Sequence, residues 1–169
     1  MRTMARFGLV MMIVLTATAV WAGEKVSIED DCDSTDAAWN SVGGCTLEDG
    51  NVTLAEFNLL LSSPLSLATV GHPAWRMDPT YLKTEPEETV HVTNNGGRNH
   101  TFTEVAHYGG GVVPGLNIGL TKAPECTSAH VLLPGDSENV TALSVGIHEF
   151  QCCIHPWMRA LIKVLDQEE

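Results

Sequence analysis

The stretch FQCCIHPWMR, residues 150–159, places a thiol, an imidazole and a thioether within seven positions. Cys152, His155 and Met158 follow one another at intervals of three, so a tight loop between two adjacent strands could aim all three side chains at one point. Electron-transfer copper sites combine two imidazoles and one thiolate with a weaker axial thioether. The second imidazole has to come from another strand, and His100 stands where a strand is predicted to begin. The sequence therefore predicts a copper site.

Short strands are predicted throughout the chain from residue 80 onward. Segments that alternate apolar and polar residues, or are rich in β-branched residues, are separated by turn signals such as Asn94–Gly97 and Pro134–Asp136. We expect strands at residues 80–84, 89–93, 101–105, 130–133, 139–143, 146–152 and 160–165. About seven short strands with turns between them are typical of an all-β, Greek-key β-sandwich.

From about residue 74 to residue 165 the chain resembles the cupredoxin family of small blue copper proteins. The resemblance rests on the early-strand motif Pro79–Leu82, an Asn-rich turn before His100, the Pro134–Gly135 turn and the aromatic-x-Cys-x-x-His-x-x-Met pattern that begins at Phe150. The ligand loop is most similar to those of amicyanin and plastocyanin. In many members an Asn after the first His ties the ligand loops together, whereas this chain has Thr101.

The resemblance implies that one type 1 copper ion, cycling between Cu(I) and Cu(II), is bound by His100, Cys152, His155 and Met158. It also implies an exported mononuclear copper protein that carries single electrons between redox partners, and not an enzyme. A copper carrier or storage protein on the same fold is the alternative. A copper oxidoreductase is less favoured, because the sequence has no second histidine cluster such as His-x-His. Partners are expected to dock transiently near His155, Pro156 and Trp157.

The chain has five cysteines, an odd number, so disulfide pairing leaves at least one thiol over. A local bridge between Cys32 and Cys45 is the economical interpretation, although each could pair elsewhere. If Cys152 faces the metal, its strand neighbour Cys153 faces the opposite side. Cys153 is then free to pair with Cys126, although no spacing rule demands this bridge.

Residues 1–22 have a basic start, an apolar run and a small-residue end, which is the pattern of a secretory signal peptide. We therefore expect a secreted or periplasmic protein with no membrane span in the mature chain.

Residues 23–73 are predicted to form an acidic extension with a short helix that starts at Thr53, and residues 74–169 to form the cupredoxin domain. Residues 23–49 are short on apolar side chains and are expected to form a loop. The formal net charge of −12 argues against nucleic acid as a partner. We expect a monomer.

Overall fold

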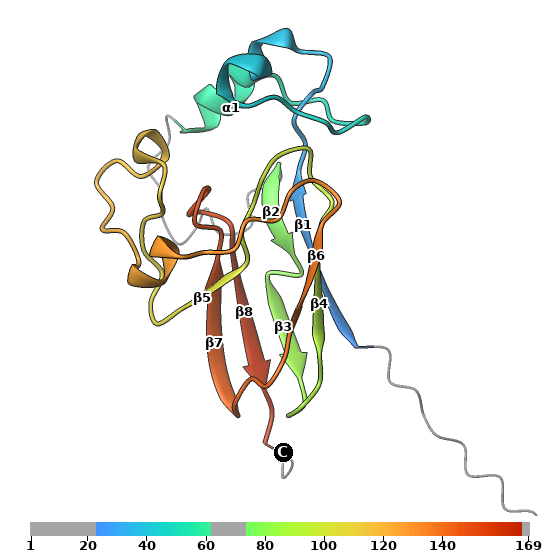
Figure 1. Ribbon diagram of the computed structural model, residues 1–169, viewed down its shortest axis with the longest axis vertical. Coiled ribbons are helices and arrows are strands. Elements are labelled where there is room, and N and C mark those ends of the chain that lie inside the picture. Colours follow the sequence, from blue (N-terminus) through green and yellow to red (C-terminus); the bar gives the residue numbers. More distant parts are fainter. Residues whose placement is uncertain (1–22, 62–73, 167–169) are drawn as a thin grey trace, which may run out of the picture.

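The computed structural model describes residues 23–61 and 74–166, so the predicted signal peptide lies outside the described residues. Two four-stranded sheets pack as a sandwich (Figure 1). The first sheet has the order β2 (Trp75–Asp78), β1 (Glu24–Asp30), β4 (Val90–Asn94), β6 (Ser137–Val140). The second has the order β3 (Tyr81–Thr84), β8 (Arg159–Val164), β7 (Gly146–Gln151), β5 (Thr103–Val105). The predicted all-β sandwich is confirmed.

The pairing of the strands mixes two directions. β1 is parallel to β4 and β3 is parallel to β8, whereas the other neighbouring strands are antiparallel. Alternate residues of each strand face the space between the sheets, as the pleat of a strand requires. This inward set includes buried aliphatic side chains from β1, β4 and β8: Val26, Ile28, Val90, Val92, Ile162 and Val164.

The expectation that residues 23–49 form only a loop is wrong at its beginning. Residues Glu24–Asp30 form β1, which pairs with β2 on one side and β4 on the other. The segment is poor in apolar residues overall, but Val26 and Ile28 alternate with polar residues, and that is sufficient for a strand with one buried face. The sandwich thus takes strands from both sides of residue 74.

The other predicted strand positions are mostly confirmed, although several bounds differ and one predicted strand is absent from the described residues. β2 was not predicted, and β6 begins at Ser137, directly after the Pro134–Asp136 turn, instead of at residue 139. Residues 130–133 do not form a strand. Within them only Leu132 makes a bridge, to His100. The Asp136 carboxylate accepts a hydrogen bond from the Leu133 amide at 2.9 Å, so the turn starts before a longer ladder can form.

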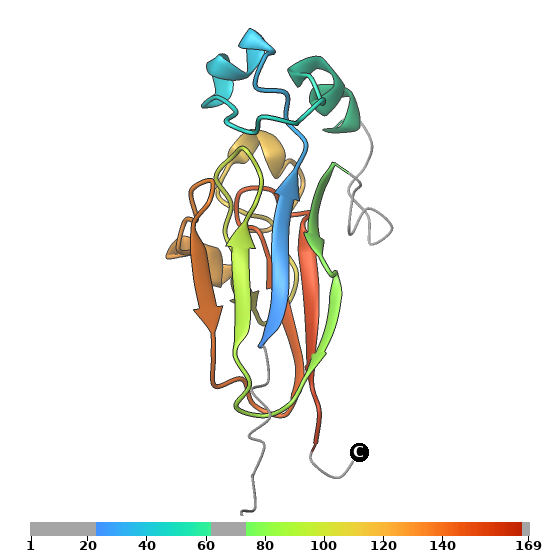
Figure 2. The same cartoon turned by 90° about the vertical axis from the view of Figure 1, so that its right-hand side faces the viewer.

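The predicted helix is present as α1 (Leu54–Leu61). Thr53 and Glu56 form a capping box, in which the Thr53 amide donates to Glu56 at 2.9 Å and the Glu56 amide donates to the Thr53 hydroxyl at 3.3 Å. A short 3₁₀ helix, η1 (Ala37–Val42), precedes it and ends at Gly43, whose φ of 102° is left-handed. We call residues 31–61 the N-terminal cap, because they lie across one end of the sandwich (Figure 2).

Both predicted disulfides are present. Cys32 is bonded to Cys45 within the N-terminal cap, and Cys126 is bonded to Cys153. The Cys126 end of the second bridge lies in η4 (Pro124–Thr127), which belongs to the segment between β5 and β6 that we call the long loop, residues 106–136. Among the described residues Cys152 is the one free cysteine, and it is buried.

Candidate metal centre

The capped end of the sandwich brings together His100, Cys152 and His155. His100 lies just before β5, and the other two lie in the turn between β7 and β8. The Cys152 Sγ is 3.7 Å from the His100 Nδ1 and 3.8 Å from the His155 Nδ1, and the two Nδ1 atoms are 3.2 Å apart. All three side chains are buried, so the donor atoms face one another away from solvent.

Backbone hydrogen bonds fix the turn that carries Cys152. Its amide donates to the Met158 carbonyl at 2.9 Å, and the Met158 amide donates to the His155 carbonyl, also at 2.9 Å. The amides of Thr101 and His155 both point at the Cys152 Sγ, each at 3.4 Å. Two amide donors aimed at one sulfur favour the thiolate form, which is the form that binds metals. Met158 is fully buried in the core at the end of this turn, and its role as an axial ligand stays a prediction.

Thr101 connects the strand that begins at His100 to the ligand turn. Its hydroxyl accepts a hydrogen bond from the Cys153 amide at 2.8 Å and another from the Thr103 hydroxyl at 3.1 Å. The position that departs from the usual Asn therefore still ties the two ligand-bearing segments together. A hydroxyl is sufficient because Cys153, pinned by its disulfide, presents its amide within reach.

One contact of the site was not predicted. The Asp30 carboxylate, at the end of β1, lies 2.7 Å from the His100 Nε2, and both side chains are 0% exposed. The sequence did carry a signal for it, because Asp30 continues the alternation of Val26 and Ile28 and so belongs to the buried face of β1. A buried carboxylate needs partners, and the nearby imidazole is one of them.

The buried groups of this site shift one another's pKa values. Burial alone would raise the pKa of Cys152, but its contacts with His100 and His155 hold that pKa well below the usual range. Burial would lower the pKa of His100, yet the Asp30 and Cys152 partners raise it to about 9. Burial lowers the pKa of His155 below its ordinary value. The contacts within the cluster therefore favour the thiolate form of Cys152, which is the form that binds metals.

The donor set fits a soft or borderline metal ion. Two imidazole nitrogens and one sulfur lie within 4.8 Å of one another in a fully buried cluster. Thiolate and imidazole donors suit copper or zinc, whereas magnesium and calcium prefer oxygen donors. A second group of candidate donors, Asp30 with Cys32 and Cys45, offers no thiolate, because its two sulfurs are bonded to each other.

Histidines outside the cluster lie elsewhere. His91, His130 and His148 make surface contacts with Asn139, Glu138 and Glu104 respectively. His107 is exposed in the long loop. Neither His107 nor His130 of the long loop joins the cluster. His72 lies outside the described residues.

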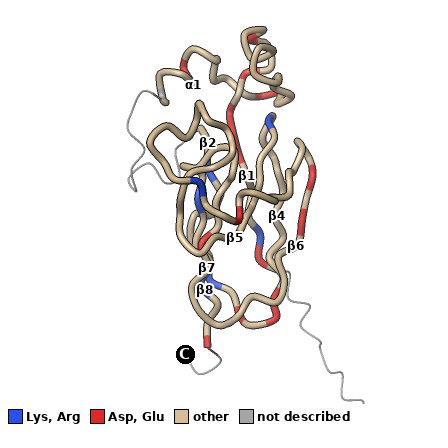
Figure 3. The backbone as a smooth tube through the Cα atoms, turned by 60° about the vertical axis from the view of Figure 1, so that its left-hand side comes forward, with Lys and Arg blue, Asp and Glu red and all other residues tan. Residues whose placement is uncertain are grey.

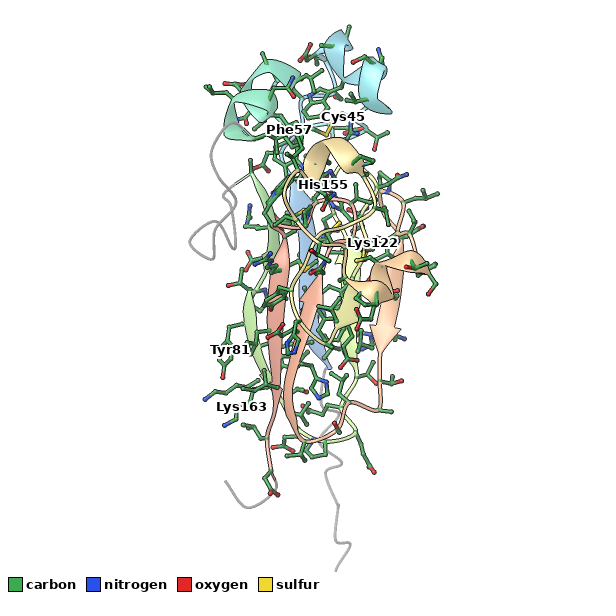
Figure 4. All side chains as sticks on the ribbon, turned by 90° about the vertical axis from the view of Figure 1, so that its left-hand side faces the viewer. Cys45, Phe57, Tyr81, Lys122, His155 and Lys163 are labelled. Carbon is green, nitrogen blue, oxygen red and sulfur yellow. A yellow bond between two sulfur atoms is a disulfide. The ribbon has the colours of Figure 1, made fainter. Side chains whose placement is uncertain are left out.

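The expected docking surface is covered. His155, Pro156 and Trp157 are all buried, with His155 only 2% exposed. Figure 4 shows Phe57 of α1 above His155 at the capped end, and the ring centroids of Phe57 lie 6.4 Å from His155 and 6.1 Å from Trp157. These three side chains are therefore not themselves exposed, and docking of a partner near them stays a prediction. Sequence reasoning treated the N-terminal segment as an appendage and did not place it over the ligand turn.

A groove lies beside the cap, with a cavity volume of about 430 Å³. His155 lines it together with residues of the N-terminal cap, the turn before His100 and the long loop. Its apolar lining includes Leu54, Phe57, Val113, Leu116, Pro134 and Ile154. Of the four candidate ligands, His155 is the one that borders the groove.

Comparison with known proteins finds similarity among solved structures alone. No family model matches the chain, and no curated protein matches it. A purple cupredoxin from Nitrosopumilus maritimus is similar at a TM-score of 0.38 and 20% identity, over 54% of this chain and 83% of that chain. Oxidized plastocyanin from Dryopteris crassirhizoma is similar at a TM-score of 0.41 and 14% identity, over 83% of this chain and 98% of that chain. A reduced amicyanin variant gives a TM-score of 0.35 at 21% identity, over 50% and 69% of the two chains.

The protein is a β-sandwich of two four-stranded sheets with a buried histidine–cysteine–histidine cluster at one end. The described residues contain no helix long and apolar enough to cross a membrane.

Proposed function

We propose that this chain is a mononuclear copper protein that carries single electrons between redox partners. The observation that carries the proposal is the convergence of the His100 Nδ1, the His155 Nδ1 and the Cys152 Sγ in one buried cluster. Met158, buried in the same turn, would add the axial thioether. When bound, copper would supply the Cu(I)/Cu(II) couple.

The protein's own contribution is to hold its donors still and dry. A scaffold that keeps one geometry in both oxidation states lowers the rearrangement needed for each transfer. The hydrogen bonds from the amides of Thr101 and His155 to the Cys152 Sγ, and the bond from the Cys153 amide to Thr101, support such a fixed geometry. Full burial of Cys152 and Met158 excludes water from the centre.

Partner docking is proposed at the groove. Its apolar lining lies beside His155, and the N-terminal cap next to it carries six acidic residues and no lysine or arginine. Figure 3 shows acidic residues along the part of the chain that carries α1. A partner with a basic rim around an apolar contact would match both features and be steered to this end by its charge. The proposed carrier is a secreted or periplasmic monomer.

The burial of His155 also favours a second candidate. His155 is only 2% exposed. Burial of a ligand imidazole would slow the loss of a bound metal, and it would also limit the access of a redox partner. The same burial would help a copper carrier or storage protein to retain its metal. The two functions differ in whether electron exchange is fast while the metal stays in place.

Visible absorption of the copper(II)-loaded protein tests the proposed centre. We expect an intense thiolate-to-copper band that disappears in Cys152→Ser. The matched control is the double variant Cys32→Ser/Cys45→Ser, which removes the two sulfurs of the N-terminal cap and should keep the band. An undiminished band in Cys152→Ser would contradict the assignment of the thiolate ligand.

A further inference from the structure

The Asp30 carboxylate is buried and has a hydrogen-bond partner on several sides. It accepts the His100 Nε2 contact at 2.7 Å and hydrogen bonds from the amides of Gly97 and Arg98, each at 3.1 Å, and of Cys32 at 3.3 Å. The Asp30 side chain is 0% exposed. Its two carboxylate oxygens are fixed by three backbone donors and one imidazole. Such a group has little freedom to turn away from His100.

The surrounding chain is shaped around this carboxylate. Gly96 lies so close to it that a side-chain carbon there would meet the Asp30 Oδ2 and would lie 2.8 Å from the Asp30 Cγ. A side-chain carbon on Gly97 would lie 2.8 Å from the Cys32 Sγ. The two glycines therefore allow the turn before His100 to close over Asp30. The Cys32–Cys45 disulfide ties the chain immediately after Asp30 to the N-terminal cap.

The contact also decides which nitrogen of His100 faces the other donors. Because Nε2 is held by Asp30, Nδ1 is directed towards Cys152 and His155. A carboxylate on the far nitrogen of a metal-binding histidine fixes the tautomer and the ring orientation and makes the ligand more basic. A more basic ligand with a negative charge behind it stabilises the higher charge of Cu(II) more than that of Cu(I).

We propose that Asp30 is a positioning residue for the metal centre, which holds His100 with Nδ1 towards Cys152 and lowers the reduction potential of bound copper. The proposal rests on the proposed function for its second half. Its first half concerns the fold alone. Asp30→Asn removes the charge at nearly constant shape, and Gly96→Ala keeps the charge but crowds the carboxylate.

The matched control is Asn94→Ala. Asn94 is also buried in this region, where its side chain donates to the carbonyls of Arg98 and Leu132 at 2.8 and 3.0 Å and accepts from the Gly96 amide at 3.0 Å. Its side-chain hydrogen bonds hold the same turn without reaching the His100 ring. Both Asn94→Ala and Asp30→Asn should therefore lower the stability of the protein. Only Asp30→Asn should change the properties of the His100 imidazole.

Two measurements test the proposal. In the metal-free protein, NMR should show a His100 Nε2 proton protected from exchange, present in the wild type and Asn94→Ala and exchanging at least about tenfold faster in Asp30→Asn. In the copper-loaded protein, Asp30→Asn should weaken Cu(II) binding by about 10–100-fold. Each tenfold weakening of Cu(II) binding that is not matched by a weakening of Cu(I) binding raises the one-electron reduction potential by about 59 mV. Gly96→Ala should shift the potential in the same direction by less.

An unprotected His100 proton in the wild type would overturn the positioning role, whether or not copper binds. A potential that is unchanged in Asp30→Asn, or raised equally in Asn94→Ala, would overturn the tuning role. If Asp30→Asn does not fold, Gly96→Ala decides, because an unshifted potential there contradicts the proposal. A wild-type protein that takes up no copper would defeat the proposed function and leave the NMR result to decide the role of Asp30 in the fold.

Discussion

The N-terminal cap and the long loop cover the same end of the sandwich, and each is held by one disulfide, but they are built differently. The cap packs through aromatic rings. The centroid of Phe57 lies 5.3 Å from that of Trp39 and 4.6 Å from that of Trp75. Arg98, below the cap, places its guanidinium 4.8 Å from the centre of the Trp39 ring and donates to the carbonyls of Val42 and Gly44.

The long loop is held mainly by hydrogen bonds to the ligand-bearing strand and turn. The Val112 amide donates to the Cys153 carbonyl at 2.7 Å, and the Gly109 amide donates to the buried Gln151 side chain at 2.9 Å. Gly111 packs so closely on the Cys153 backbone that a side-chain carbon there would collide with it. A small apolar cluster around Cys126 and Cys153 also supports this side, and Leu116 and Leu132 of the loop pack with the main core.

The difference assigns a separate task to each region. Aromatic packing shields His155 from water but bonds to none of the donor atoms, so the cap controls access to the site. Hydrogen bonds and a disulfide at Cys153 act on the residue beside Cys152, so the long loop controls the geometry of the thiolate. Changes in the cap should therefore alter stability and metal release, and changes in the long loop should alter the spectrum.

The largest effect is expected from Trp39→Ala in the cap. Trp39 is 1% exposed and its indole N–H donates to the Val52 carbonyl at 3.0 Å. Loss of a buried Trp costs about 3–5 kcal/mol, so urea unfolding of the metal-free protein should show a loss of this size, with faster removal of copper by a chelator. Trp39→Phe, which keeps a ring, should lose much less. A spectrum changed as strongly as the rate of release would contradict the division between the two regions.

Removal of the long-loop disulfide by Cys126→Ser/Cys153→Ser should cost somewhat less, about 3 kcal/mol. We expect the copper absorption to shift or weaken, because the chain beside Cys152 loses its anchor. The comparison variant is Cys32→Ser/Cys45→Ser, which should destabilise the cap. If the long-loop variant keeps the spectrum and the copper affinity of the wild type, the geometric role of the loop is wrong.

Gln151→Leu should have a smaller effect. The Gln151 side chain is fully buried, and its replacement leaves the Gly109 amide without an acceptor, at a cost of about 1–3 kcal/mol. Denaturant unfolding measures the loss. Equal stability of Gln151→Leu and the wild type would show that this hydrogen bond does not hold the loop.

The smallest effect concerns His148 of β7, which belongs to neither region and provides a baseline. Partial burial lowers the pKa of His148, but its contacts with Glu104 and the Ser144 carbonyl outweigh this and raise it. A raised folded-state pKa gives stability that is fully present below the ordinary pKa of histidine and is lost as pH rises through the folded value. The stability difference between wild type and His148→Gln should thus shrink on going from pH 5.5 to about pH 8. A difference that grows with pH would contradict the assigned direction.

Sequence reasoning predicted the sandwich and the three clustered donors because both are recorded in local patterns. The alternation of short strands and the spacing of Cys152, His155 and Met158 need no knowledge of distant contacts. His100 was found because a copper site requires a second imidazole. The disulfides followed from the odd number of cysteines and the alternation of Cys152 and Cys153 along the chain.

What sequence reasoning missed depends on packing between distant segments. β1 was hidden by the acidic composition around it, and Asp30 meets His100 across 70 positions of sequence. His155 is covered by aromatic residues of the cap. In the sequence these residues look like the apolar face of any amphipathic helix, and only the position of the helix in space shows that they cover His155. The groove, and the burial of the expected docking surface, follow from the same placement.

Voltammetry of the copper-loaded protein in the presence of a mild copper chelator tests the central claim most directly. The proposed electron carrier should give a reversible one-electron wave at one copper per chain, with peak currents that persist over repeated cycles. An irreversible wave, with copper passing to the chelator on reduction, would contradict electron transfer as the function and favour a copper carrier or storage protein.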